Sequence, residues 1–208
     1  MVRSSINHSR FIPGLVMHPY LDAERDWILI HQNNANLAVC SVYMAADTGG
    51  GDHIVWNENL YSMIQSEMTV LQGEGYSCVL AGDFNGHIGD DEGGVEGNLQ
   101  DVNHNGRLVR DFIFPNGLSI VIADRERCEG VFTRVGANSV SLLDLVLEDK
   151  LIVQSLVVDE ECKLLGGSNH APLIFTINIG KEQSEPPVVM CQTQQNSMKA
   201  SSNTNLNL

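Results

Sequence analysis

Apolar residues in this chain gather in short runs separated by polar and glycine-rich segments. The runs at 27–30 and 37–43 are almost continuously apolar and flank a polar stretch at 31–36, which predicts two strands joined by a hairpin. Such runs are typical of a sheet covered on both faces. Further strands are predicted at 76–81, 118–122, 131–133, 142–147, 151–158 and 171–179.

Two segments have helical spacing. The first covers 57–72, where apolar residues recur at intervals of four, four and three, and glycines at 73 and 75 end it. Its four apolar positions are Leu60, Ile64, Met68 and Leu71. The second helix is predicted to begin at 105–107 and to end at Pro115-Asn116-Gly117.

Strands that alternate with two helices predict a layered α/β domain. The length of 208 residues suits one sizeable core rather than two. We expect the domain to occupy 27–180, after an N-terminal segment at 1–26 with weak periodicity. From 181 to 208 the chain is rich in Gln, Ser, Asn and Thr, and such a composition predicts a disordered tail.

The charge balance bears on possible partners. The net charge is −14, and the chain has only 12 Lys and Arg residues. Proteins that bind phosphate backbones usually have a basic face, so the composition disfavours tight, unaided binding to DNA. A local basic patch is still compatible with five arginines that are partly clustered in sequence: Arg107, Arg110, Arg125, Arg127 and Arg134.

Cysteines and apolar stretches bear on the compartment. The five cysteines form no Cys-x-x-Cys pair and are odd in number, which indicates neither a zinc site nor a disulfide framework. No apolar stretch approaches the roughly 20 residues that cross a bilayer, and the start lacks the apolar region of a signal peptide. We therefore expect a soluble intracellular protein, nuclear or cytoplasmic, without a membrane partner.

Candidate chemistry lies where apolar runs meet polar residues. Asp83 and Asn85 follow the run at 78–81, Asp144 lies in the run at 142–147, and His170 precedes the last run. Taken singly, each has an ordinary structural interpretation: an Asx-turn, a strand cap and a satisfied polar histidine. Taken together, they offer a histidine with a carboxylate partner and oxygen ligands suited to Mg²⁺. This combination predicts metal-assisted hydrolysis of a phosphate ester.

Three of these stretches, in order and spacing, resemble consecutive motifs of the endonuclease/exonuclease/phosphatase superfamily. They are Gly82-Asp83-Phe84-Asn85, Ser141-Leu142-Leu143-Asp144-Leu145-Val146-Leu147 and Ser168-Asn169-His170-Ala171-Pro172-Leu173. The segment at 103–118 is similar to the endonuclease domains of LINE-type retrotransposons, and Val42-Tyr43 resembles a strand that ends in a substrate-contacting tyrosine. The resemblance covers roughly 27–179.

The resemblance implies a sandwich of two sheets flanked by helices, with the active site at one sheet edge. It also implies roles: Asp83 orients or deprotonates the attacking water, and Asn85 helps to hold the phosphate. His170 stabilises the charge that develops on the phosphorane, Asp144 orients His170, and Tyr43 contacts the scissile phosphate.

Two positions depart from the family pattern. Asn169 stands where the family has a metal-site Asp, and an amide in place of a carboxylate should weaken binding of Mg²⁺ or Mn²⁺. The family also begins with a strand that bears an Asn and a strand that bears a metal-ligating Glu. Glu24 is the only Glu before position 27, and its context does not match. We therefore expect the first strands to be missing and the chain to be a fragment of a longer gene product.

Three functional hypotheses follow from these observations. The first is a Mg²⁺-dependent phosphodiester hydrolase of the retrotransposon endonuclease type, with DNA as substrate. The second is a catalytically silent relic that acts as a scaffold or interaction module, which the two departures and the acidic composition favour. The third is a phosphatase that acts on a small or lipid phosphoester.

Overall fold

The apolar runs become the strands of two main sheets in the computed structural model of the chain. Secondary structure alternates as the sequence predicts, with two helices placed between strands. The structure describes residues 7–11, 24–32, 35–46, 52–90, 94–96, 100–136, 139–160, 168–178 and 188–191.

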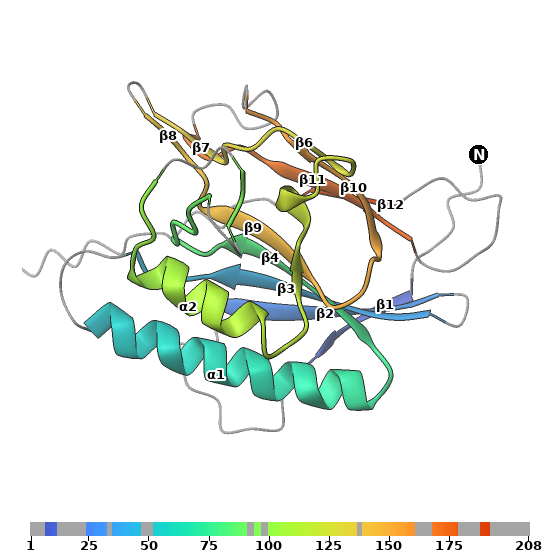
Figure 1. The fold of residues 1–208 in the computed structure, drawn as a ribbon. Helices are drawn as coiled ribbons and strands as arrows, with labels where there is room; N and C mark the ends of the chain where they lie inside the picture. The colour runs from blue at the N-terminus through green and yellow to red at the C-terminus, as the bar shows by residue number, and fades with distance from the viewer. Residues whose placement is uncertain are drawn as a thin grey trace, which may run out of the picture.

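The first sheet has six strands, in the spatial order β1 (Asn7–Phe11), β2 (Arg25–Gln32), β3 (Ala35–Tyr43), β4 (Ser77–Asp83), β9 (Asp144–Glu148) and β5 (Ser119–Ile120). The pair β2 and β3 forms the predicted hairpin, which confirms that expectation. The central pair β3 and β4 is parallel, whereas β9 runs antiparallel to β4. As a result, the end of β3, the end of β4 and the start of β9 meet at one edge of the sheet (Figure 1).

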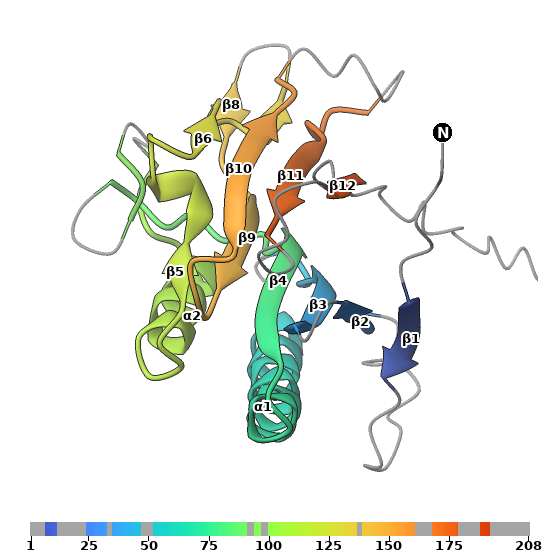
Figure 2. The ribbon, with the colours of Figure 1, turned by 90° about the vertical axis from the view of Figure 1, so that its right-hand side faces the viewer.

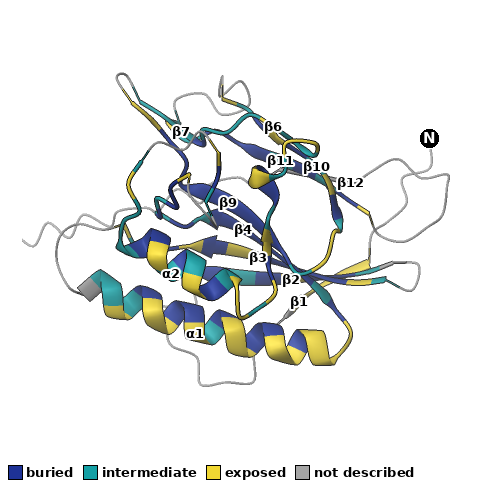
Figure 3. Cartoon of the chain, viewed as in Figure 1, coloured by how far each residue is buried: buried dark blue, intermediate teal, exposed yellow. Residues whose placement is uncertain are grey.

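Two helices, α1 (Asp52–Gly73) and α2 (His104–Ile113), cover one face of this sheet (Figure 1). The four apolar residues that predicted α1 are all buried, and Figure 3 shows the side of α1 turned away from the sheet as largely exposed. The side chain of Asn103 caps α2 by accepting a hydrogen bond from the amide of Gly106 at 2.8 Å. Helical spacing therefore identified the buried face of α1 correctly.

The second sheet lies on the opposite side of the first sheet from the helices (Figure 2). Its strands, in spatial order, are β12 (Val188–Cys191), β11 (Leu173–Ile177), β10 (Val153–Val158) and β6 (Cys128–Glu129). A separate hairpin consists of β7 (Arg134–Val135) and β8 (Val140–Ser141), and a 3-10 turn, η2, covers Val121–Ala123. The layered α/β fold with two sheets and flanking helices is thus confirmed.

Several element boundaries differ from the sequence prediction. Helix α1 begins at Asp52, five residues before the predicted start at 57. The prediction began late because it relied on apolar spacing, which the first turn of the helix lacks. Only Ser119–Ile120 of the run at 118–122 is a strand, and the remainder turns into η2. Val121 and Ile122 are nevertheless buried. Their apolar character therefore indicated burial correctly, although these residues are not part of a strand. No strand covers 131–133, and β7 begins at the next residue.

The two ends of the chain also depart from expectation. Val188–Cys191 pairs antiparallel with β11, so the prediction of a disordered tail is wrong for these four residues. A short apolar segment can satisfy its backbone groups on an exposed strand edge even when the surrounding composition is polar. Within the predicted N-terminal segment, Asn7–Phe11 forms β1 and pairs with β2. The rest of both segments lies outside the described residues, apart from the start of β2 and the residue before it.

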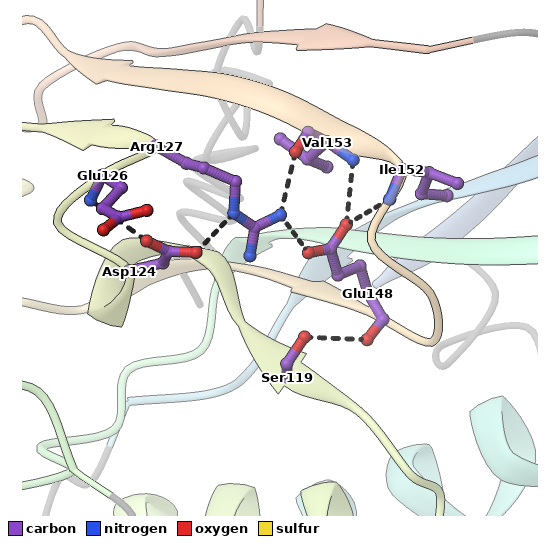
Figure 4. Close-up of polar contacts among 7 residues, drawn as sticks. All are labelled: Ser119, Asp124, Glu126, Arg127, Glu148, Ile152 and Val153. Atoms are coloured by element: carbon purple, nitrogen blue, oxygen red, sulfur yellow. Dashed lines mark hydrogen bonds and ion pairs between the residues drawn. The ribbon is translucent and has the colours of Figure 1, made fainter.

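A buried ion pair joins the two sheets (Figure 4). Glu148, at the end of β9, has a fully buried side chain and lies 2.6 Å from the Nη1 atom of Arg127. Its second carboxylate oxygen accepts hydrogen bonds from the amides of Ile152 and Val153, each at 2.9 Å. Arg127 also donates to Asp124 at 2.6 Å. The carboxylate is therefore fully hydrogen-bonded, which is what a buried charge requires.

No helix among the described residues has the length and apolar character needed to span a bilayer.

Candidate active site

The residues predicted from sequence meet where β3, β4 and β9 end or begin. Tyr43 is paired with Asp83, and Asp83 is paired with Asp144. The amide of Phe84 donates to the carbonyl of Leu143 at 2.9 Å. In an antiparallel ladder, this flanking bond makes Asp83 and Asp144 a non-hydrogen-bonded pair, whose side chains share a face and lie close together. Two carboxylates therefore meet at the sheet edge.

The carboxylate of Asp144 holds His170. The Nδ1 atom of His170 lies 3.0 Å from Oδ2 of Asp144, and the Asp144 side chain is buried. The hydroxyl of Thr133 accepts hydrogen bonds from the amides of Leu143 at 2.9 Å and Asp144 at 2.8 Å, which fixes the start of β9. The hydrogen bond to Asp144 raises the pKa of His170, against the opposing effect of burial. The imidazolium form is thereby favoured.

Asp83 has an environment that disfavours its charge. Burial, followed by repulsion from Asp144, raises the pKa of Asp83 to about 7. A hydrogen bond from the amide of Asn85 and the charge of His170 oppose this rise. A carboxyl group with a pKa near neutrality can accept a proton from water during a reaction at neutral pH.

Asn85 stabilises the turn that follows β4. Its amide donates to Oδ1 of Asp83 at 2.9 Å, so the Asx-turn that is the ordinary interpretation of Asp-x-Asn is present. Its φ of 47° lies in the left-handed region, which asparagine tolerates better than most residues. One Nδ2 hydrogen is used by the carbonyl of Met44 at 2.8 Å. The second Nδ2 hydrogen has no acceptor among the described residues.

A buried network of asparagines holds the two loops that carry the site. Asn57 on α1 exchanges two hydrogen bonds with the backbone of Ala45, both at 2.9 Å, and donates to Oδ1 of Asn105 at 2.9 Å. Asn105 on α2 donates to the carbonyls of Ala45 at 2.9 Å and Asn85 at 3.2 Å. Sequence reasoning missed Asn57, because an asparagine within a helical pattern gives no sign of its distant partners.

Tyr43 and Glu24 lie next to each other at this edge. Tyr43 is 48% exposed, and its amide donates to the carbonyl of Glu24 at 2.8 Å. Burial, the charge of Asp83 and the charge of Glu24 raise the pKa of Tyr43, so its hydroxyl stays protonated as a donor. Burial also raises the pKa of Glu24. Glu24 does not fit the family pattern in sequence, yet pairing of β2 with β3 brings it beside Tyr43.

Three of the predicted residues can together hold a metal ion. One ligand atom from each of Asp83, Asp144 and His170 lies within 4.8 Å of the other two. Carboxylate oxygens suit Mg²⁺, and an added imidazole suits Mn²⁺, so this donor set fits a divalent cation. Asn169 is exposed, and its carbonyl accepts a hydrogen bond from the amide of Val135 at 2.8 Å. Its role as a metal ligand stays a prediction.

Arg134 is a site residue that the sequence did not single out. It forms an isolated β-bridge with His170, and its charge lowers the pKa values of Asp83 and His170. The partial clustering of arginines was the only signal for it.

Comparisons with known proteins bear on this arrangement. No family model matches the chain, and the search of curated proteins found no match. Among solved structures, the endonuclease domain of TRAS1, a telomere-specific non-LTR retrotransposon, matches with a TM-score of 0.57 and 16% identity. That match covers 85% of this chain and 69% of the other. The chain has the endonuclease/exonuclease/phosphatase fold.

Two further structures agree with this fold. The 3' phosphatase NExo from Neisseria, solved bound to a product DNA hairpin, matches with a TM-score of 0.55 and 19% identity, over 85% of this chain and 72% of the other. An endonuclease/exonuclease/phosphatase family protein from Leptotrichia buccalis matches with a TM-score of 0.51 and 17% identity, over 74% and 53%. The resemblance seen in the three sequence motifs is thereby confirmed for the fold.

Proposed function

We propose that the chain hydrolyses phosphodiester bonds in DNA with a divalent cation, as an endonuclease domain of the retrotransposon type. The observation that carries this proposal is the clustering of Asp83, Asp144 and His170 at one sheet edge, with one ligand atom of each within 4.8 Å of the other two. Similarity to the TRAS1 endonuclease fold supports it. The same residues, in their three motifs, are those that the sequence resemblance assigns to hydrolysis.

In this proposal Asp83 is the general base. It takes a proton from the attacking water, the water oxygen bonds to phosphorus, and the bond from phosphorus to the leaving ester oxygen breaks. The raised pKa of Asp83, about 7, matches that task because a base works best when its pKa lies near the working pH.

The other side chains bind and orient the phosphate. His170, oriented by its hydrogen bond to Asp144, donates to an oxygen that gains charge as the transition state forms. The free Nδ2 hydrogen of Asn85 and the hydroxyl of Tyr43 supply further donors from the neighbouring strand ends. A cation held by the carboxylates of Asp83 and Asp144 would polarise the phosphate, whereas His170 could ligate a cation only in its neutral form and acts here as a hydrogen-bond donor.

A nicking assay on supercoiled plasmid with Mg²⁺ or Mn²⁺ tests the proposal. We expect Asp83→Ala and His170→Ala each to lower the nicking rate about 100-fold or more, because each removes a proton-transfer or charge-stabilising group. Asp111→Ala removes an equal charge from an exposed position on α2 and should keep the wild-type rate. Equal background nicking by all four proteins would refute the proposal and favour a catalytically silent relic.

A further inference from the structure

Arg134 lies directly opposite His170 across a β-bridge. The amide of Val135 donates to the carbonyl of Asn169 at 2.8 Å, and the amide of Ala171 donates to the carbonyl of Thr133 at 2.6 Å. These two flanking bonds define Arg134 and His170 as a non-hydrogen-bonded pair, in which the side chains share a face and approach closely. The stem of Arg134 therefore begins beside the imidazole that contacts Asp144.

The charge of Arg134 affects the ionisation of several neighbouring groups. It lowers the pKa values of Asp83 and His87, in and just after the end of β4, and of His170, which lies far along the chain. Since an arginine is always charged in proteins, this side chain places a permanent positive charge beside the carboxylates.

The guanidinium of Arg134 has no acceptor among the residues that the structure describes. Asp144 is already bonded to His170, and Asp83 accepts from the amide of Asn85. A guanidinium has five N–H donors in a planar fork that fits two oxygens of one phosphate. Its place in the fold does not depend on the guanidinium, because the backbone bonds of β7 and the Thr133 hydroxyl fix this segment.

We propose that Arg134 is a phosphate-binding residue, which holds a non-bridging oxygen of the substrate phosphate next to His170. The inference rests on the proposed function insofar as this phosphate belongs to a phosphodiester. It adds a cation at the sheet edge to a chain whose net charge of −14 is otherwise unfavourable for phosphate. Arg134 thus compensates locally for the overall acidity.

The test is calorimetric titration with inorganic phosphate in EDTA, so that neither turnover nor a metal ion contributes to the signal. We expect Arg134→Gln to raise the Kd for phosphate about tenfold or more, as loss of a charge-assisted contact predicts. Arg107→Gln removes the same charge from an exposed position on α2 and should leave the Kd within about twofold, because surface charges are screened. Arg134→Lys keeps the charge and should bind more tightly than Arg134→Gln.

Three results would overturn the inference: no phosphate binding by the wild type, an unchanged Kd in Arg134→Gln, or equal weakening by Arg134→Gln and Arg107→Gln. Circular dichroism of each variant establishes that it is folded before titration. Failure of the proposed function is a separate outcome. A wild-type protein that never nicks plasmid, yet binds phosphate through Arg134, would refute the nuclease proposal and leave the phosphate site standing.

Discussion

We expect Asp144→Asn to lower the pKa of Asp83. The two carboxylates form a directly opposed pair on β4 and β9, and repulsion from Asp144 is the second largest cause of the raised pKa of Asp83, after burial. Asparagine keeps the shape of the side chain but removes its charge. The carboxylate of Asp83 should then ionise more readily, although it stays as buried as before.

The size of the effect follows from the pairing geometry. Opposed side chains of this kind have Cβ atoms about 5 Å apart, and two unit charges at about that distance interact by about 3 kcal/mol at an effective dielectric constant of about 20. This energy corresponds to about 2 pKa units. Asp144→Asn also removes the main cause of the raised pKa of His170, so part of the positive charge that opposes the rise at Asp83 is lost as well. We therefore expect a net fall of about 1 unit from the value of about 7.

Carbon-13 NMR of the aspartate carboxyl carbons, followed from about pH 4 to about pH 9, measures this pKa directly. His170→Gln is the matched control, since it removes the positive neighbour and leaves Asp144 in place. That variant should raise the pKa of Asp83, the opposite direction to Asp144→Asn. An unchanged pKa in Asp144→Asn would refute the reasoning and leave burial as the whole cause.

Three further predictions concern stability. Because the folded-state pKa of Asp83 is raised from 3.8 to about 7, the stability that it contributes is present below about pH 4 and lost as the pH rises through about 7. This difference of about 3 pKa units corresponds to about 4 kcal/mol, so Asp83→Asn should raise the free energy of unfolding, and with it the Tm, by at most about 4 kcal/mol at about pH 8 and leave both nearly unchanged at about pH 4. Glu148→Ala should cost about 3–5 kcal/mol in urea unfolding, because Arg127 is left without its buried partner, whereas Glu126→Ala at an exposed position should cost little. Gly106→Ala would place a Cβ 1.9 Å from the carbonyl oxygen of His87 and should cost about 1–3 kcal/mol together with a loss of nicking, whereas Gly73→Ala meets no atom within 4 Å and should be neutral.

The main strands and the positions of Asp83, Asp144 and His170 could be predicted from sequence. Asp83 ends β4, Asp144 begins β9, and His170 lies three residues before β11. Polar residues where buried strands begin or end lie at the rim of the sheet, where binding and catalytic groups are commonly found. The order of their motifs then sufficed to indicate a common fold.

Pairing register explains what the sequence did not reveal. Glu24 reaches Tyr43 only because β2 pairs with β3, and Arg134 reaches His170 only through an isolated bridge between distant segments. Asn57 contacts Asn105 because two helices pack on the same sheet face. None of these contacts leaves a periodic or local signal, because each depends on which residues the completed fold brings opposite one another.

The three residues Asp83, Asp144 and His170 come from segments far apart in the chain, and this has a consequence for folding. Asp83 ends β4 and is opposed by Asp144 on β9, and Asp144 contacts His170, which lies after β10. Contacts of this kind form late, since long loops must close before they can form. A refolding chain should therefore regain its helical signal before it regains phosphate binding. An early folding intermediate would therefore not bind phosphate. Phosphate binding would report specifically on the last steps of refolding.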